Sequence, residues 1–148
     1  MMKITSQPWR LLRGTASSGT WNMAVDEALL ERVIAGASQP VLRLYAWQPA
    51  CLSLGQAQPA ADVDGRRLRE HGWDLVRRPT GGRAILHTDE LTYAVIAPVG
   101  EPRVAGTLLE SYLKLSTALR AALELLGLDV TAREEAGAAE AARRKNPV

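Results

Sequence analysis

The stretch at residues 77–87 reads RRPTGGRAILH and holds the densest group of residues that could do chemistry. Arg77, Arg78 and Arg83 surround the adjacent glycines Gly81 and Gly82. Because glycine has no Cβ and readily adopts positive φ, backbone N–H groups at this pair can approach a ligand closely. The guanidinium groups add planar donor forks that suit carboxylate or phosphate groups. The combination indicates a site for an anionic or thioester-bearing ligand, whereas Pro-Thr-Gly-Gly by itself is typical of an ordinary turn.

Cys51 is the only thiol in the chain and therefore the first candidate for a nucleophile. It lies in an apolar segment with no neighbour in sequence that would lower its pKa, and buried cysteines in strands are generally inert. We therefore predict that Cys51 is not catalytic. A single cysteine also excludes an internal disulfide.

The helices that must position these residues are indicated by apolar spacing and by end signals. Residues 17–36 favour a helix that Ser18 or Thr20 caps and that Gly36 ends. A short helix is expected at 62–72 and a long one at 106–127. The apolar stripes expected on the first and last helices are Trp21, Ala24, Ala28 and Val33, and Leu108, Leu109, Tyr112, Leu115, Leu119, Ala122, Leu123 and Leu126.

The strands are indicated by short runs of β-branched, aromatic and leucine residues between turn residues. Residues 51–56 are expected to pair with the strand before them across a turn at Pro49. The predicted strands are 40–47, 51–56, 73–78, 84–87 and 90–98, with a further one at 128–131.

The order of these elements predicts an α+β fold in which a mixed β-sheet is packed with helices. With 148 residues and 47% hydrophobic content, the chain fits one domain, 1–148. Residues 132–148 have no apolar face and are predicted to form a flexible tail. A formal charge of +2 is too small to indicate a nucleic-acid or membrane surface. Since no signal peptide or apolar span is present, we expect a soluble, cytoplasmic protein.

The stretch RRPTGGRAILHTDELTYAV resembles the signature of the biotin ligase, lipoate ligase and octanoyltransferase superfamily. Upstream, NMAVDEALL and VLRLYAWQPACLSLGQAQ are similar to the opening helix and first strand pair of that superfamily, in the same order. The resemblance covers about residues 9–130 and implies the superfamily's catalytic-domain fold. It is nearest to the cysteine-dependent octanoyltransferases, because lipoate ligases usually have a third glycine at Arg83 and a different sequence after His87.

The resemblance implies a two-step acyl transfer. A thiolate takes octanoate from octanoyl-acyl carrier protein, and a lysine of the glycine cleavage H protein or another lipoyl carrier domain then takes it from the enzyme. This scheme needs no metal or nucleotide. The resemblance assigns the substrate pocket to Arg78, Thr80, Gly81, Gly82, Arg83 and His87. The octanoyl tail needs an apolar lining, and the strand residues that could supply it, although they are first of all core, are Leu44, Leu54, Val76, Ile85 and Val95.

The nucleophile that the resemblance implies comes after a stretch similar to Lys-Asn-Pro, which here stands at the end of the sequence, RRKNPV. We therefore expect the nucleophilic cysteine just after Val148, with its assisting lysine further on, and no catalytic residue within the chain. Lys145 lies in a basic run that is typical of a solvated surface. On this interpretation the catalytic domain is incomplete at its C-terminus and inactive alone. Either the chain is truncated or a second polypeptide completes it.

Two other functions remain open at this point. The first is an ATP-dependent lipoate-protein ligase, in which ATP and magnesium would be required and the glycine loop would face an acyl-adenylate. The second is a non-catalytic module that binds acyl or lipoyl carrier domains. Transfer to a carrier separates an enzyme from a binding module, and dependence on ATP separates a ligase from a transferase.

Overall fold

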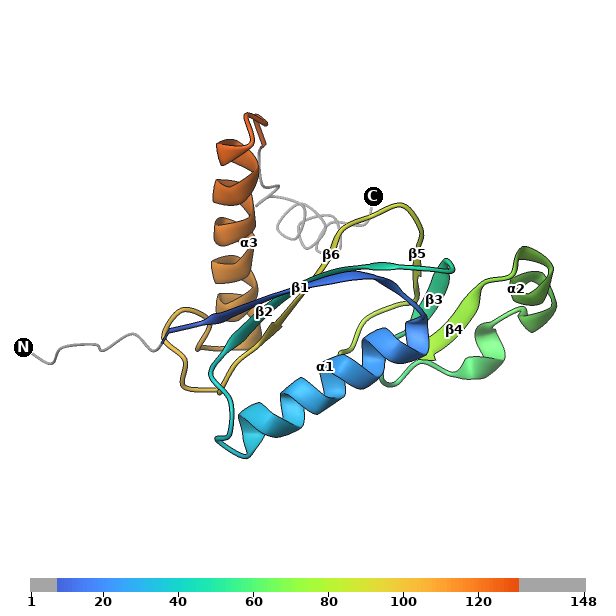
Figure 1. The fold of residues 1–148 in the computed structure, drawn as a ribbon, viewed down its shortest axis with the longest axis horizontal. Coiled ribbons are helices and arrows are strands. Elements are labelled where there is room, and N and C mark those ends of the chain that lie inside the picture. Colours follow the sequence, from blue (N-terminus) through green and yellow to red (C-terminus); the bar gives the residue numbers. More distant parts are fainter. Residues whose placement is uncertain (1–7, 131–148) are drawn as a thin grey trace, which may run out of the picture. The chain divides into compact units, whose positions relative to one another are not determined.

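The computed structural model describes residues 8–130 of the 148, and the predicted tail at 132–148 lies outside the described residues (Figure 1). The chain divides into two compact units, Met1–Pro98 and Val99–Val148. The first unit holds all the described strands and two α-helices, and the second holds one α-helix. Among the described residues, no helix is long and apolar enough to cross a membrane.

The first sheet of unit one has the strand order β1-β2-β6 and is mixed. β1 runs parallel to β2, and β6 runs antiparallel to β2, with Leu42 opposite Val95. The three strands are β1 (Arg10–Ser17), β2 (Val41–Trp47) and β6 (Thr92–Ile96).

The second sheet has the strand order β4-β3-β5 and is also mixed. Its strands are β3 (Cys51–Leu54), β4 (Asp74–Arg77) and β5 (Ile85–His87). β3 pairs in parallel with β4 and antiparallel with β5. Two mixed sheets with helices confirm the predicted α+β class.

Two features of the strands differ from the sequence-based expectation. β3 does not pair with β2, because β1 and β6 occupy both edges of β2, so β3 forms the centre of its own sheet. β1 was not predicted, since RLLRGTAS lacks a regular alternation and most of its residues are exposed. Its conformation depends on parallel pairing with β2, a contact between segments about thirty residues apart in sequence.

Helix α1 (Gly19–Ile34) connects β1 to β2 and packs on the sheets of unit one. Ser18 is its N-cap and accepts a hydrogen bond from the backbone N–H of Trp21, which confirms one of the two predicted caps. The predicted apolar stripe is wrong apart from Val33, because Trp21 is 62% exposed. The buried face instead carries two polar residues, Asn22 and Asp26, so hydropathy alone points away from it.

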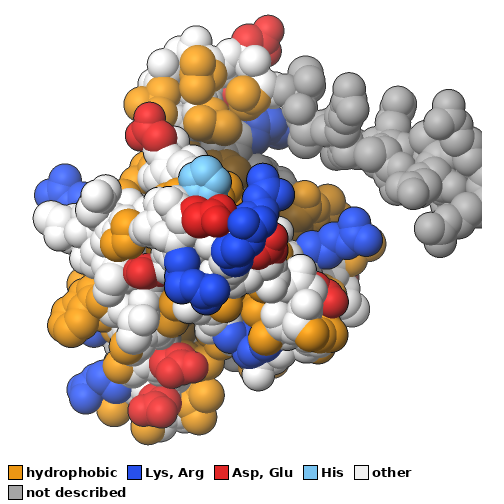
Figure 2. Space-filling model, turned by 90° about the vertical axis from the view of Figure 1, so that its right-hand side faces the viewer, with side chains coloured by type: hydrophobic (Ala, Val, Ile, Leu, Met, Phe, Trp, Pro, Cys, Tyr) orange, Lys and Arg blue, Asp and Glu red, His pale blue; other side chains and the backbone are white. Residues whose placement is uncertain are grey.

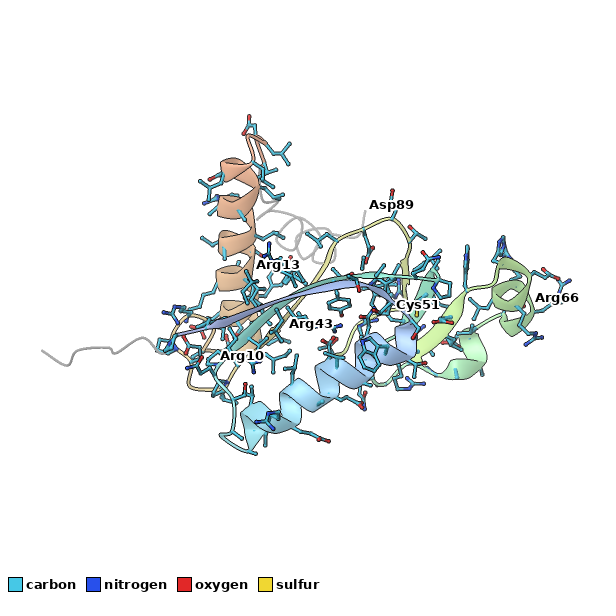
Figure 3. All side chains as sticks on the ribbon, in the orientation of Figure 1. Arg10, Arg13, Arg43, Cys51, Arg66 and Asp89 are labelled. Carbon is cyan, nitrogen blue, oxygen red and sulfur yellow. The ribbon has the colours of Figure 1, made fainter. Side chains whose placement is uncertain are left out.

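Those polar residues belong to a buried network that joins α1 to β2 (Figure 3). Arg43, only 4% exposed, donates to Asp26 Oδ1 at 2.6 Å and to Asn22 Oδ1 at 2.8 Å. The Tyr45 hydroxyl donates to Asp26 Oδ2 at 2.9 Å. Burial, and then the nearby Asp26 carboxylate, raise the pKa of Tyr45, which therefore stays protonated as a donor. The charge of Arg43 is compensated, as a buried cation requires.

The remaining helices follow their end signals closely. α2 (Gly65–His71) is capped by Asp64 and ends at Gly72, which has a φ of 65°. In unit two, α3 (Leu108–Leu125) begins with a capping box formed by Thr107 and Glu110. No residue of α3 is buried, so its predicted apolar stripe is not a core face among the described residues. The strand expected at 128–131 is not formed at 128–130, and residue 131 is not described.

Candidate functional site

The loop at residues 78–84 leaves β4, turns through the two glycines and returns as β5. Its backbone is fixed against the end of β3. The N–H of Arg78 donates to the carbonyl of Leu54 at 3.0 Å, and the carbonyl of Thr80 accepts from the N–H of Gln56 at 2.9 Å. Of the two glycines expected to allow positive φ, Gly82 adopts it, with a φ of 92°, and Gly81 does not.

Gly55 allows the loop to lie this close to β3. A Cβ built on Gly55 would stand 2.0 Å from the carbonyl oxygen of Gly82, and Gly55 itself does not have positive φ. Only a residue without a side chain fits there. The sequence-based pocket assignment missed Gly55, although a glycine directly after a strand signals a close approach of backbone.

Arg78 holds the loop from inside. One terminal nitrogen, Nη2, donates to the carbonyls of Gly81 and Arg83 at 2.7 and 2.8 Å. The other, Nη1, donates to the carbonyl and hydroxyl oxygens of Ser53 at 3.0 and 3.2 Å. The donor fork expected to bind a ligand is thus directed at the protein's own backbone.

The carbonyls of Thr80, Gly81 and Arg83 therefore accept hydrogen bonds from the protein. Within the described residues, the N–H groups of Thr80, Gly81, Gly82 and Arg83 make no hydrogen bond. Consecutive backbone N–H groups without protein acceptors can donate hydrogen bonds to an oxyanion or to a polarised carbonyl oxygen.

The other two arginines of the loop differ from each other. Arg77 donates to the carbonyls of Gly55, Gln56 and Gln58 at 2.7–3.2 Å, so it holds the segment that follows β3. The guanidinium of Arg83 is exposed and pairs with none of the described residues. Arg83 is the loop arginine whose charge is available to a ligand.

The surface around α2 is of mixed charge. Figure 2 faces the side of the molecule on which α2 lies in Figure 1, and it shows basic side chains gathered next to acidic ones. Arg66, for example, pairs with Glu70 at 3.1 Å on α2. This face offers no uniform basic surface of the kind that binds nucleic acid.

His87 ends β5 behind the loop and is 6% exposed. Its Nε2 lies 2.8 Å from Ser53 Oγ, and its Nδ1 lies 2.5 Å from Glu90 Oε1. Its ring stacks on that of Trp47, with 4.1 Å between the centroids. The structure thus places His87 next to the loop, as predicted, but with both nitrogens directed to protein groups.

Glu90 interacts with His87 from the segment between β5 and β6. It also accepts a hydrogen bond from the hydroxyl of Thr92 at 2.8 Å. Burial by itself would raise the pKa of Glu90, but hydrogen bonds from His87 and Thr92 and the charge of His87 outweigh it and lower that pKa. Glu90 is therefore an ionised acceptor at neutral pH. Neither Ser53 nor Glu90 was singled out from sequence, because nothing in their local pattern signals this contact.

Cys51 is completely buried in β3, as expected of a cysteine in an apolar strand. Burial, and then the Asp74 carboxylate, raise the pKa of Cys51 to about 12. A Cβ on Gly19 would stand 2.5 Å from its sulfur, so α1 covers the thiol closely. Among the described residues, no three His, Cys, Asp or Glu side chains form a cluster that could hold a metal ion.

The apolar residues expected to line an acyl tunnel do not share one surface. Leu44 and Val95 lie on the face of the first sheet opposite the buried face that carries Arg43 and Tyr45. In the second sheet, Val76 and Ile85 are both paired with Ser53. Leu54, next in β3, is on the opposite face and is 2% exposed, so it serves as core.

The chain is similar in sequence to proteins named octanoyltransferase. Octanoyltransferase LipM of Carboxydothermus hydrogenoformans is 46% identical over 124 residues, and LipM of Staphylococcus aureus is 41% identical over 125 residues. These alignments cover 83% and 84% of this chain, but the chain spans only 46% and 45% of those relatives.

Solved structures show the same fold at lower identity. A bipartite lipoate protein ligase from Thermoplasma acidophilum matches with a TM-score of 0.66 at 27% identity, over 84% of this chain and 48% of that one. A lipoate-protein ligase A bound with ATP matches with a TM-score of 0.66 at 26% identity, over 83% and 49%. Residues 18–144 match the lipoyl protein ligase A/B catalytic domain, and the chain belongs to that family.

Proposed function

We propose that this chain forms the acyl-binding part of an octanoyltransferase. The enzyme would move octanoate from octanoyl-acyl carrier protein to a lysine of a lipoyl carrier domain, such as the glycine cleavage H protein. Relatives named octanoyltransferase, at 41–46% identity, support the reaction class. The observation that carries the proposal is the run of four loop N–H groups, at 80–83, without acceptors among the described residues.

These N–H groups suit the chemistry of a thioester. When a thiolate attacks the octanoyl carbonyl, its oxygen becomes an anion, and the carrier's thiolate leaves as the tetrahedral intermediate collapses. The lysine amine then repeats the sequence and expels the enzyme thiolate. Each well-placed donor to the oxyanion contributes about 3 kcal/mol to lowering such a barrier. The donors are already in place because Arg78 holds the carbonyls of Gly81 and Arg83.

The site residues divide into two groups on this proposal. Thr80, Gly81, Gly82 and Arg83 contact the acyl thioester or its carrier, with Arg83 providing the charge. Arg78 and His87 belong to the pocket as the residues that hold the loop, since their polar atoms are bonded to protein groups.

The nucleophile is a cysteine outside residues 1–148. Cys51 is the single thiol of this sequence and is fully buried, and its raised pKa leaves almost no thiolate at neutral pH. Residues 1–148 alone should therefore bind an acyl ligand without transferring it.

The proposal is tested with the protein expressed from its natural reading frame. Mixing it with octanoyl-acyl carrier protein, without nucleotide, should give an adduct of octanoyl mass, and added lipoyl domain should discharge it. An adduct or product that requires ATP and magnesium would assign the protein to the ligases. Binding of the carriers without any transfer would make it a binding module.

A further inference from the structure

A continuous line of hydrogen bonds runs from β6 to the glycine loop through the exposed Glu90 and the buried His87 and Ser53. Trp47 Nε1 donates to Thr92 Oγ1 at 2.7 Å, and Thr92 donates to Glu90. Glu90 contacts His87 Nδ1, and His87 Nε2 contacts the hydroxyl of Ser53. The line connects three segments distant in sequence, and Ser53 links it to the guanidinium that holds the loop.

The direction of every hydrogen bond in this line follows from its two ends. Arg78 can only donate, so Ser53 Oγ accepts from it, and the proton of Ser53 is directed to His87 Nε2. An ionised Glu90 can only accept, so His87 Nδ1 donates to it. In its neutral form, His87 therefore carries its proton on Nδ1, and its Nε2 is an acceptor.

The order Ser53, His87, Glu90 matches the connections of a nucleophilic triad, but the surroundings argue against that role. Ser53 is 1% exposed, which leaves no room for a carbonyl carbon beside its oxygen. Its oxygen also receives a hydrogen bond from Arg78, which reduces its nucleophilicity. The geometry is better suited to holding a partner than to attacking a substrate.

We propose that Glu90 is a positioning residue that fixes the His87 tautomer and thereby orients Arg78 and the loop at 80–83. If the acceptor at Glu90 is lost, the His87 proton can move to Nε2. Ser53 Oγ would then face two donors, His87 and Arg78, and its own proton would have no acceptor. When Ser53 turns to give its proton an acceptor, Arg78 loses one of the oxygens that it binds, and the loop carbonyls that Arg78 holds are displaced with it.

The test uses the small number of histidines in the chain. The sequence has only two histidines, and the other one, His71, lies in α2 and stacks on Trp73. Ring nitrogen NMR spectra at about pH 8, above the range in which histidines ordinarily gain a proton, then report each tautomer. A His71→Gln variant assigns the signals.

We expect the Nδ1–H tautomer for His87 in the unmodified protein. Glu90→Ala should shift it toward Nε2–H and move the backbone amide signals of Gly81 and Gly82. Glu90→Gln keeps an acceptor oxygen and should restore both. The matched control is Asp89→Ala, which removes the same charge from the neighbouring position (Figure 3). Asp89 makes no hydrogen bond or ion pair with any described residue, so this substitution should change neither readout.

Three results would overturn the proposal. They are an Nε2–H tautomer in the unmodified protein, loop amide signals that Glu90→Ala leaves in place, and a Glu90→Gln variant that behaves as Glu90→Ala does. These readouts need no acyl ligand, so they are independent of the proposed function. In a separate measurement, affinity for an octanoyl-pantetheine amide should fall about tenfold in Glu90→Ala. Unchanged affinity with displaced loop signals would count against the loop as the acyl site and leave the positioning role standing.

Discussion

Gly55→Ala is the substitution that most directly tests whether the loop at 80–83 must lie against β3. The added Cβ would stand 2.0 Å from the carbonyl oxygen of Gly82 and 2.9 Å from its carbonyl carbon. Heavy atoms essentially never approach a Cβ within 3.0 Å, so the loop must retreat by about 1 Å. No side-chain rotation can relieve the clash, because both partners are backbone.

The expected consequence is larger for ligand binding than for stability. Overpacking of this kind costs about 1–3 kcal/mol of folding free energy. A displacement of about 1 Å in groups that position a substrate can lower activity by ~100-fold. The N–H groups at 80–83 move with the carbonyl of Gly82, so affinity for an octanoyl-pantetheine amide should fall steeply.

Gly100→Ala is the matched control, because Gly100 lies outside the loop, a Cβ there would meet no atom within 4 Å, and its φ is not positive. Binding by titration calorimetry, thermal melting and loop amide shifts should be measured on both variants. If Gly55→Ala binds the octanoyl-pantetheine amide as tightly as Gly100→Ala does, the loop is not the acyl site that we infer.

Four further outcomes are expected. Gly82→Ala places a Cβ on a residue with a φ of 92°, at 3.0 Å from Arg78 Nη2. The melting temperature should fall modestly, and the affinity for the octanoyl-pantetheine amide should fall by more than this loss of stability accounts for. Asp26→Ala leaves the buried charge of Arg43 without a counter-ion and should reduce the free energy of unfolding in urea by about 3–5 kcal/mol. Cys51, whose pKa is raised to about 12, should resist iodoacetamide in the native protein and react once urea unfolds it; rapid native labelling would contradict its burial. Because the pKa of Glu90 is lower in the folded than in the unfolded protein, ionised Glu90 stabilises the fold above the unfolded-state pKa, and this contribution is lost as pH falls through the lower folded-state pKa. In Glu90→Gln, the melting temperature should therefore fall less steeply with decreasing pH below about pH 4.5.

Several features of the fold follow from the sequence because they depend on a few adjacent residues. Ser18 caps α1, Gly72 ends α2 with positive φ, and Gly82 adopts the positive φ expected of the loop. Capping and backbone sterics act over a single turn, so the local sequence is enough to predict them. The burial of Cys51 follows in the same way from the apolar run around it.

Strand pairing could not be predicted at the same level. The sequence suggested that β3 pairs with the strand before it, but β2 is already bounded by β1 and β6. The buried face of α1 was missed because Asn22 and Asp26 are polar, and only Arg43 on β2 makes their burial favourable.

The candidate site likewise has features that depend on local sequence and features that depend on tertiary contacts. The sequence by itself determined that a glycine pair flanked by arginines would form a loop, and from it we predicted a site for an acyl or anionic ligand. Only the tertiary structure decided that Arg78 holds the loop from within, that Gly55 admits it, and that Glu90 and His87 support it. Ser53 and Arg78 are 25 residues apart, and Ser53 and His87 are 34 apart, so their hydrogen bonds exist only once β3, β4 and β5 have paired. Contacts made by pairing of distant segments have no local pattern, which is why the sequence by itself could name the loop but not the residues that hold it.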